Sequence, residues 1–313
     1  MCFTATTSIN YSIIIPNKNH PELLQYCLDS IPVREDVQVI VVDDNSDADK
    51  VDFDSFPRWR GACFECVFNK DGLGAGHARN EGLNRAKGKW VLFVDADDFL
   101  LPTANRVFDE EKDTDADIVF FKPKAVMLGD RVTPSPRANK YIEIVDEYLK
   151  SGNEIDLRSK WYVPWSKMMR RDFIVSHALC FDEIVYSEDM TFSIKAGIFA
   201  KKIMVRNEPY YCVTRSDNSM TSRFMGGEFQ SIFADVMFRS HELLHENNYP
   251  LDEIISFSCL RRLISTDRKS FFLIFNQMHE MGYKKAWLIK EIFKGNSVIS
   301  RIKRSVYVLL FSK

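Results

Sequence analysis

The sequence of 313 residues lacks a long hydrophobic segment, since no apolar run approaches the ~20 residues that a membrane span requires. Its first ten residues are polar and do not resemble a signal peptide. The seven cysteines are odd in number and irregularly spaced, which favours reduced thiols over a disulfide framework. A net charge of only -2 provides no basic excess for binding nucleic acid. We therefore expect a cytoplasmic globular protein without a nucleic-acid partner.

The sequence also lacks the paired cysteine spacing of a zinc finger. The chain contains one CxxC pattern, Cys63-Phe64-Glu65-Cys66, and no second pair at the spacing of a zinc finger. This pattern favours structural thiols over a metal or redox site.

What the sequence does contain is a series of short apolar runs that alternate with helical patterns. We expect strands over 11–15, 37–42, 64–68, 90–94 and 116–121, and helices over 21–31, 77–86, 144–150 and 187–199. Strands that alternate with helices indicate a mostly parallel sheet covered by helices. Because the runs are continuously apolar, both faces of this sheet are predicted to be buried.

Three carboxylates follow the run Trp90–Val94, at Asp95, Asp97 and Asp98. They could belong to a solvated loop with a helix N-cap, or to a metal or ligand site. Polar clusters also follow two earlier strands, at 16–19 and 43–46. The carboxyl ends of parallel strands meet at one rim, where such sheets bind ligands. This convergence favours an active site.

A glycine-rich stretch with glycines at 72, 74 and 76 precedes the second helix. It fails the dinucleotide-binding fingerprint, because the last glycine is out of place and the turn follows the third strand. A helix that begins here and carries Arg79 predicts a phosphate or carboxylate contact, with a solvated arginine as the alternative.

Four ordered stretches carry a resemblance to a known family. They are Ile13-Ile14-Ile15-Pro16-Asn17-Lys18-Asn19, Val41-Val42-Asp43-Asp44-Asn45-Ser46, Ala78-Arg79-Asn80-Glu81-Gly82-Leu83 and Phe93-Val94-Asp95-Ala96-Asp97-Asp98. In order and spacing they resemble the family 2 glycosyltransferases with the GT-A fold, over about residues 11–220. The resemblance implies an α/β fold for nucleotide-diphospho-sugar transfer, followed by a C-terminal helical extension.

The resemblance also implies roles for individual residues at the donor side. Pro16, Asn19 and Asp44 would border the nucleotide base, with Asp44 accepting a hydrogen bond from uracil. Arg79 would lie near the diphosphate. Asp95 to Asp97 resembles the DxD motif, in which Asp97 would bind Mn²⁺ or Mg²⁺ and Asp95 or Asp98 would contact ribose or metal-bound water. Carboxylate oxygens are hard ligands that suit either ion.

Further motifs belong to the second half of the predicted site. Trp161 to Lys167 is aromatic and could stack on an acceptor sugar or simply pack over the sheet. Ser187-Glu188-Asp189 opens a helix and could be its N-cap. It resembles the family's ED motif, in which Asp189 would be the catalytic base. Arg215 and Ser219 would contact the diphosphate.

The C-terminal region differs in charge from the rest. We expect a catalytic domain over 1–222 and a helical region over 223–313. Residues 283–313 contain eight Lys or Arg and one Glu, a net charge of +7, against -9 for residues 1–282. Apolar side chains interleave with these cations, which suits an anionic membrane surface, with a core-docked helix as the alternative.

Together these features predict an inverting, metal-dependent glycosyltransferase. Its donor would be a nucleotide sugar, most plausibly a UDP-sugar, and its acceptor a glycan or lipid-linked intermediate of surface polysaccharide. A location at the inner face of the plasma membrane would follow from the tail. A nucleotidyltransferase and a non-catalytic nucleotide-sugar-binding protein are the alternatives.

Overall fold

A computed structural model of the chain describes residues 8–216, 227–249, 260–261, 263–264, 267–280 and 283–293. The chain divides into two compact units, Met1–Ser219 and Met220–Lys313. The assignment of catalysis to the first unit and of a separate role to the second stays a prediction.

The first unit contains a seven-stranded sheet with the order β3-β2-β1-β4-β8-β6-β9. Its strands are β1 (Tyr11–Asn17), β2 (Val37–Asp44), β3 (Cys63–Asn69), β4 (Trp90–Phe93), β6 (Ile118–Phe121), β8 (Lys167–Arg170) and β9 (Ile203–Arg206). β2 is buried along its whole length, as expected for a central strand covered on both faces.

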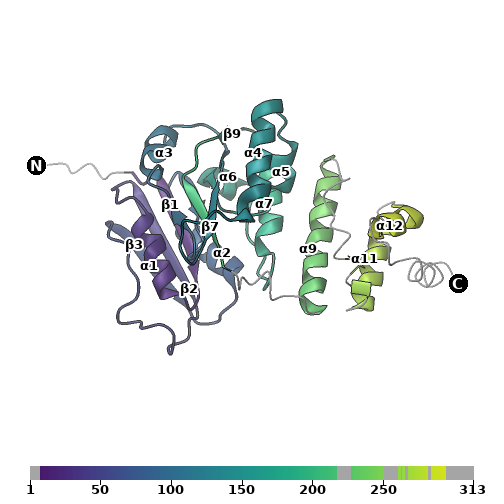
Figure 1. Cartoon of the computed structure of the whole chain (residues 1–313), viewed down its shortest axis with the longest axis horizontal. Helices are drawn as coiled ribbons and strands as arrows, with labels where there is room; N and C mark the ends of the chain where they lie inside the picture. The colour runs from purple at the N-terminus through teal and green to yellow at the C-terminus, as the bar shows by residue number, and fades with distance from the viewer. Residues whose placement is uncertain are drawn as a thin grey trace, which may run out of the picture. The chain divides into compact units, whose positions relative to one another are not determined.

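Helices cover the sheet in the manner that the alternating pattern predicts. They are α1 (Pro21–Ser30), α2 (Ala75–Arg85), α3 (Ala104–Glu111), α4 (Asn139–Ser151), α5 (Ile155–Lys160), α6 (Arg171–Ser176) and α7 (Glu188–Phe199), with a 3₁₀ turn η1 at Pro136–Ala138. α2 packs on β1 and β2, and Gly82 permits the close approach: a Cβ there would lie 2.3 Å from Ile14 Cγ2. Figure 1 shows α4, α5 and α7 gathered on one side of the sheet.

Parallel pairing brings the three polar strand ends to one rim, as predicted. β1 pairs in parallel with β2 and with β4, so the carboxyl ends of these strands lie side by side. The Asn17 amide donates to Asp43 Oδ2 at 2.9 Å, which joins the ends of β1 and β2 directly. This rim is the place where the fold positions functional side chains.

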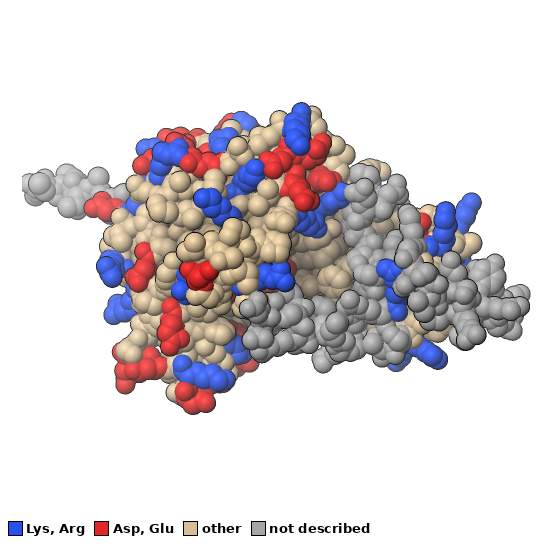
Figure 2. Space-filling model, viewed as in Figure 1, with Lys and Arg blue, Asp and Glu red and all other residues tan. Residues whose placement is uncertain are grey.

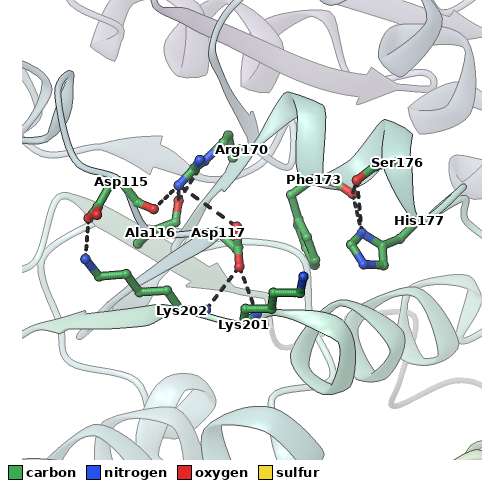
Figure 3. A network of polar contacts seen from close by, with 9 residues as sticks. All are labelled: Asp115, Ala116, Asp117, Arg170, Phe173, Ser176, His177, Lys201 and Lys202. Carbon is green, nitrogen blue, oxygen red and sulfur yellow. Dashed lines mark hydrogen bonds and ion pairs between the residues drawn. The ribbon is translucent and has the colours of Figure 1, made fainter.

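β8 is the exception to the parallel arrangement, because it runs antiparallel to both β4 and β6. A polar network fixes its far end (Figure 3). The Arg170 guanidinium donates to the backbone oxygens of Asp115 and Ala116, while Asp117 Oδ2 accepts from the backbone N–H groups of Lys201 and Lys202. These contacts lie at the amino ends of β6 and β9, opposite the rim.

A second, three-stranded sheet has the order β5-β10-β7, with β5 at Phe99–Leu100, β7 at Lys124–Met127 and β10 at Tyr211–Arg215. β5 begins directly after the acidic cluster that follows β4. Because β5 pairs with β10, residues about 110 positions later in the chain lie against that cluster.

The second unit is helical in its described parts, as predicted. It contains α9 (Gly227–Glu246), α11 (Arg268–Glu280) and α12 (Lys285–Ile292). α9 and α11 contact each other, and His241 Nε2 lies 2.5 Å from the Tyr283 hydroxyl. Within the described residues, every helix is too short or too polar to cross a membrane. Most of the predicted basic tail, residues 294–313, lies outside the described residues.

Candidate active site

The acidic cluster after β4 is the centre of the candidate site. One carboxylate oxygen from each of Asp95, Asp97 and Asp98 lies within 4.8 Å of the others. The three differ in surroundings: Asp98 is 1% exposed, Asp95 is half-buried and Asp97 is exposed. The alternative, in which these carboxylates belong to a solvated loop, is therefore wrong for Asp98.

Asp98 is held by β10. Its carboxylate accepts a hydrogen bond from the Tyr211 hydroxyl and another from the Thr214 N–H, each at 2.6 Å. Burial, with Asp97 and Asp95 nearby, raises the pKa of Asp98 well above its usual range. Asp98 thus anchors the second sheet to the cluster, and its predicted contact with ribose or metal-bound water stays a prediction.

Asp97 is the carboxylate of this cluster that faces outward. Although its surface is exposed, the surrounding protein and then Asp95 raise its pKa, and Arg137 and His20 oppose the rise. The Thr214 hydroxyl donates to its backbone oxygen at 2.9 Å, which fixes the backbone. An outward carboxylate beside two partly engaged ones suits Mg²⁺ or Mn²⁺, ions that proteins bind through few carboxylates plus substrate phosphates. The donor set therefore fits the predicted metal, with Asp97 as the accessible carboxylate, and metal binding by Asp97 stays a prediction.

The predicted base-binding residues lie at the ends of β1 and β2. Asp44 is buried, and its two carboxylate oxygens each lie 3.1 Å from the Gly74 N–H, with Lys18 Nζ 3.4 Å away. Asn19 adopts a φ of 61° and donates its N–H to Ser46 Oγ at 2.8 Å. Pro16 lies within β1, one residue before its end. The structure brings these residues to one edge, and their contact with a nucleotide stays a prediction.

The glycine-rich loop and α2 pack against the segment that precedes α7, which carries Glu188 and Asp189. Gly74 has a φ of 96°, a conformation that L side chains rarely adopt. A Cβ on Gly76 would lie 2.1 Å from the Asp182 backbone oxygen, so only glycine allows this contact. The Asn80 side chain donates to Phe181 O at 3.0 Å and accepts from Phe181 N at 2.8 Å. The segment before α7 is thus fixed to α2.

Arg79 projects from α2 between the acidic cluster and α7. Nη2 donates to Asp95 Oδ1 and Nη1 to Glu188 Oε1, both at 2.8 Å, and the residue is 5% exposed. The alternative that Arg79 is a solvated side chain is therefore wrong, and its predicted contact with carboxylates is observed. The contact with a diphosphate stays a prediction.

Asp189 is half-buried in the first turn of α7. The N-cap position belongs to Ser187, whose φ is 58° and whose side chain makes no capping hydrogen bond, so Asp189 is not the N-cap residue and its role as base stays a prediction. Desolvation and then the Glu188 charge raise the pKa of Asp189 to about 7, and Arg79 opposes the rise. A carboxylate with a pKa near 7 is suited to accept a proton at neutral pH.

The aromatic segment before β8 is packed in the core. Trp161 is 1% and Trp165 2% exposed, and Trp165 stacks on Tyr211 with ring centroids 5.8 Å apart. Tyr141 contacts both tryptophan rings at about 5 Å. The packing interpretation is therefore confirmed, and the tryptophans do not offer a free stacking surface for an acceptor sugar.

Three residues near the site were not predicted from the sequence. Tyr211 donates to Asp98, and Arg137 is an exposed cation on η1 whose charge acts on Asp97. Lys167 is 1% exposed at the start of β8, and burial lowers its pKa to about 7 although Asp189 favours its charged form. Lys167 ends the predicted stretch Trp161 to Lys167, and the apolar residues Trp165 and Met168 around it were a usable signal for its burial. No pattern marked the other two.

Arg215 ends β10, and its side chain is exposed. With Ser216 and the turn after β7 it lines a cavity of about 510 Å³. Ser219 lies outside the described residues. The diphosphate contacts predicted for Arg215 and Ser219 stay predictions.

Comparison with known proteins identifies the family of this chain. The model of the family named glycosyl transferase family 2 matches residues 12–189, which is more than half of the chain. The chain belongs to this family. Membership of a family of glycosyl transferases sets the nucleotidyltransferase alternative aside.

Among its family 2 relatives is the uncharacterized glycosyltransferase EpsJ of Bacillus subtilis, 30% identical over 222 residues. That match covers 67% of this chain and 62% of EpsJ, so it leaves more than a third of EpsJ unmatched. Staphylococcus aureus TarS, a poly(ribitol-phosphate) beta-N-acetylglucosaminyltransferase, is 25% identical over 70% of this chain and 38% of its own length.

Solved structures show the same fold. The structure of S. aureus TarS 1-349 with UDP-GlcNAc has a TM-score of 0.57 at 22% identity and covers 91% of this chain and 82% of its own. The mannosyltransferase PcManGT of Pyrobaculum calidifontis, with GDP-Man and Mn²⁺, has a TM-score of 0.53 at 15% identity and covers 97% and 84%. The predicted GT-A fold with a C-terminal helical part is therefore confirmed.

Proposed function

We propose that this family 2 glycosyltransferase transfers a sugar from a UDP-sugar to an acceptor hydroxyl with inversion at the anomeric carbon. The observation that carries the proposal is the placement of Asp189 beside the acidic cluster. Glu188, its neighbour, is joined to Asp95 through Arg79 by two 2.8 Å contacts. A carboxylate of pKa about 7 thus stands close to the predicted donor-binding end.

In the proposed reaction the acceptor oxygen attacks the anomeric carbon as the bond from that carbon to the diphosphate oxygen breaks. Asp189 takes the proton of the acceptor hydroxyl, and the bonding electrons leave with UDP. A single displacement of this kind inverts the anomeric configuration. Bound at Asp97, Mn²⁺ or Mg²⁺ would neutralise charge on the departing diphosphate.

Uracil is proposed as the base of the donor nucleotide because of Asp44. Asp44 presents a buried carboxylate that already accepts from a backbone N–H, and further lone pairs on it could accept from the N3–H of uracil. The TarS neighbour was solved with UDP-GlcNAc, whereas the mannosyltransferase neighbour was solved with GDP-Man. An assay with a panel of UDP- and GDP-sugars tests which of these two nucleotides the donor carries.

The acceptor is proposed to be a glycan or lipid-linked intermediate of surface polysaccharide. TarS is named as acting on poly(ribitol phosphate), a polymeric acceptor, and the net charge of +7 over residues 283–313 suits an anionic membrane surface. The cytoplasmic, membrane-peripheral location is part of this proposal. Sedimentation with vesicles tests it: the full chain should bind anionic but not neutral vesicles, and Lys303→Glu with Arg304→Glu should weaken that binding. Equal binding of anionic vesicles by both proteins would contradict a membrane contact through this tail.

The catalytic proposal is tested by transfer and hydrolysis assays on the UDP-sugar panel with Mn²⁺. Asp97→Ala should lose metal-dependent UDP binding, measured by calorimetry. Asp189→Asn should bind UDP normally and lose transfer by about 10²- to 10⁴-fold, the usual contribution of a general base. Asp172→Asn, at an 88% exposed carboxylate on α6, is the matched control. Full transfer by Asp189→Asn would exclude Asp189 as the base, and absence of any transfer by wild type would favour a binding protein.

A further inference from the structure

A single buried guanidinium connects the two halves of the site. Arg79 lies on α2, Asp95 follows β4, and Glu188 begins α7, so three separate elements meet at this side chain. Both of its Nη atoms face a carboxylate oxygen at 2.8 Å. The side chain of Arg79 is 6% exposed, that of Glu188 15% and that of Asp95 25%. The contact is therefore largely shielded from water.

The surroundings hold Arg79 in this position. Its guanidinium carbon lies 5.4 Å from the centroid of the Phe181 ring, and Nε is buried without a hydrogen-bond partner among the described residues. Phe181 itself is fixed to α2 by the two Asn80 hydrogen bonds. An arginine that turned toward a bound phosphate would leave two partly buried carboxylates unpaired, and such a loss is strongly unfavourable.

We propose that Arg79 is a positioning residue that sets the spacing between the donor end and the base end of the site, and is not a ligand of the diphosphate. Its Nη2 contact orients the first carboxylate of the DxD motif, and its Nη1 contact fixes the start of α7. The inference rests on the proposed function, because Asp97 and Asp189 give the two ends their roles. Precise placement matters, since a displacement of about 1 Å can lower a rate about 100-fold.

The experiment compares wild type with Arg79→Lys, Glu188→Ala and the double variant. A lysine keeps the charge, but its single ammonium group cannot reproduce the planar fork that reaches two carboxylates. We expect kcat to fall about 10- to 100-fold in each single variant, while the KM for the UDP-sugar and the calorimetric Kd for UDP with Mn²⁺ change less than threefold. The double variant should lose no more than the worse single variant, because both break one bridge.

Arg85→Lys is the matched control. It lies on the same helix, and its ion pairs with Glu81 and Glu65 are one-third exposed and belong to no part of the proposed site. We expect its kcat and KM to equal those of wild type.

A different result would overturn the inference. If Arg79 binds the diphosphate, Arg79→Lys should raise the KM and the Kd for UDP tenfold or more, Glu188→Ala should leave both unchanged, and the losses should multiply. If Arg79→Lys does not fold, Glu188→Ala decides alone: a kcat lowered tenfold or more with unchanged UDP affinity supports the bridge. A smaller loss, which the change in the Asp189 pKa would give by itself, or an unchanged kcat excludes it. Failure of wild type to transfer any sugar would instead reject the proposed function, so the two failures are distinct.

Discussion

Replacing the proposed base should make the protein more stable while it abolishes transfer. In Asp189→Asn the amide matches the shape of a carboxylic acid but cannot ionise. Desolvation and the neighbouring Glu188 raise the pKa of Asp189 from 3.8 to about 7, which means that the ionised form is unfavourable in the folded protein. An asparagine avoids that penalty at every pH.

The magnitude follows from the size of the shift. Each pKa unit corresponds to 1.36 kcal/mol, so a rise of about three units sets an upper limit of about 4 kcal/mol. Asp189 is half-buried and partly screened by solvent, and we therefore expect roughly 2–4 kcal/mol at pH 8. Between about pH 4 and pH 7 the folded state keeps a proton that the unfolded chain has released. Wild-type stability thus falls across this window as pH rises, and the advantage of the variant grows.

Thermal unfolding of both proteins at pH 5 and pH 8 measures this effect. At about 2–4 °C per kcal/mol, Tm of the variant should exceed that of wild type by roughly 4–16 °C at pH 8 and by less than half as much at pH 5. Asp172→Asn, at an exposed carboxylate, should show no shift at either pH. An equal gain at both pH values, or none, would refute a raised pKa at Asp189.

Three further predictions concern the same site. The transfer rate of wild type should rise about tenfold per pH unit below pH 7 and level off above it, because the base must be deprotonated; a flat profile from pH 5 to 8 would contradict this. Tyr211→Phe removes the 2.6 Å hydrogen bond to Asp98 and should lower the free energy of unfolding in urea by about 1–3 kcal/mol; an unchanged midpoint would count against that anchor. Gly76→Ala places a Cβ 2.1 Å from the Asp182 oxygen and should reduce transfer far more than UDP affinity, whereas Gly129→Ala, with open space around it, should reduce neither.

Much of the donor side of the fold could be predicted from the sequence. The apolar runs that became β1, β2 and β4 are long and continuous, and each ends in polar residues, so their parallel pairing and shared rim follow from general rules. Asp95 and Asp97 were recognisable because several carboxylates seldom follow a buried strand without a ligand or partner.

Other parts could not be predicted, for physical reasons. Apolar periodicity reports burial but not strand direction, so nothing in Lys167–Arg170 marks β8 as antiparallel. β5 and β10 form a pair that depends on contacts 110 residues apart, and the role of Tyr211 depends on that pairing. The position of Arg79 on a helix was predictable, yet which two carboxylates it would meet depended on where α7 packs.

The antiparallel strand β8 also determines when the first unit can fold. β4 and β6 do not touch each other directly, because residues 167–170 lie between them in the sheet. During synthesis at about 5–20 residues per second, the facing edges of β4 and β6 therefore stay unpaired for several seconds after β6 is complete. Open edges of this kind invite pairing with other chains. A nascent chain that stops before residue 167 thus carries the strands β3-β2-β1-β4 without β8, and a β6 that lacks both of its partners, β8 and β9. Chaperone binding should be strongest in that interval.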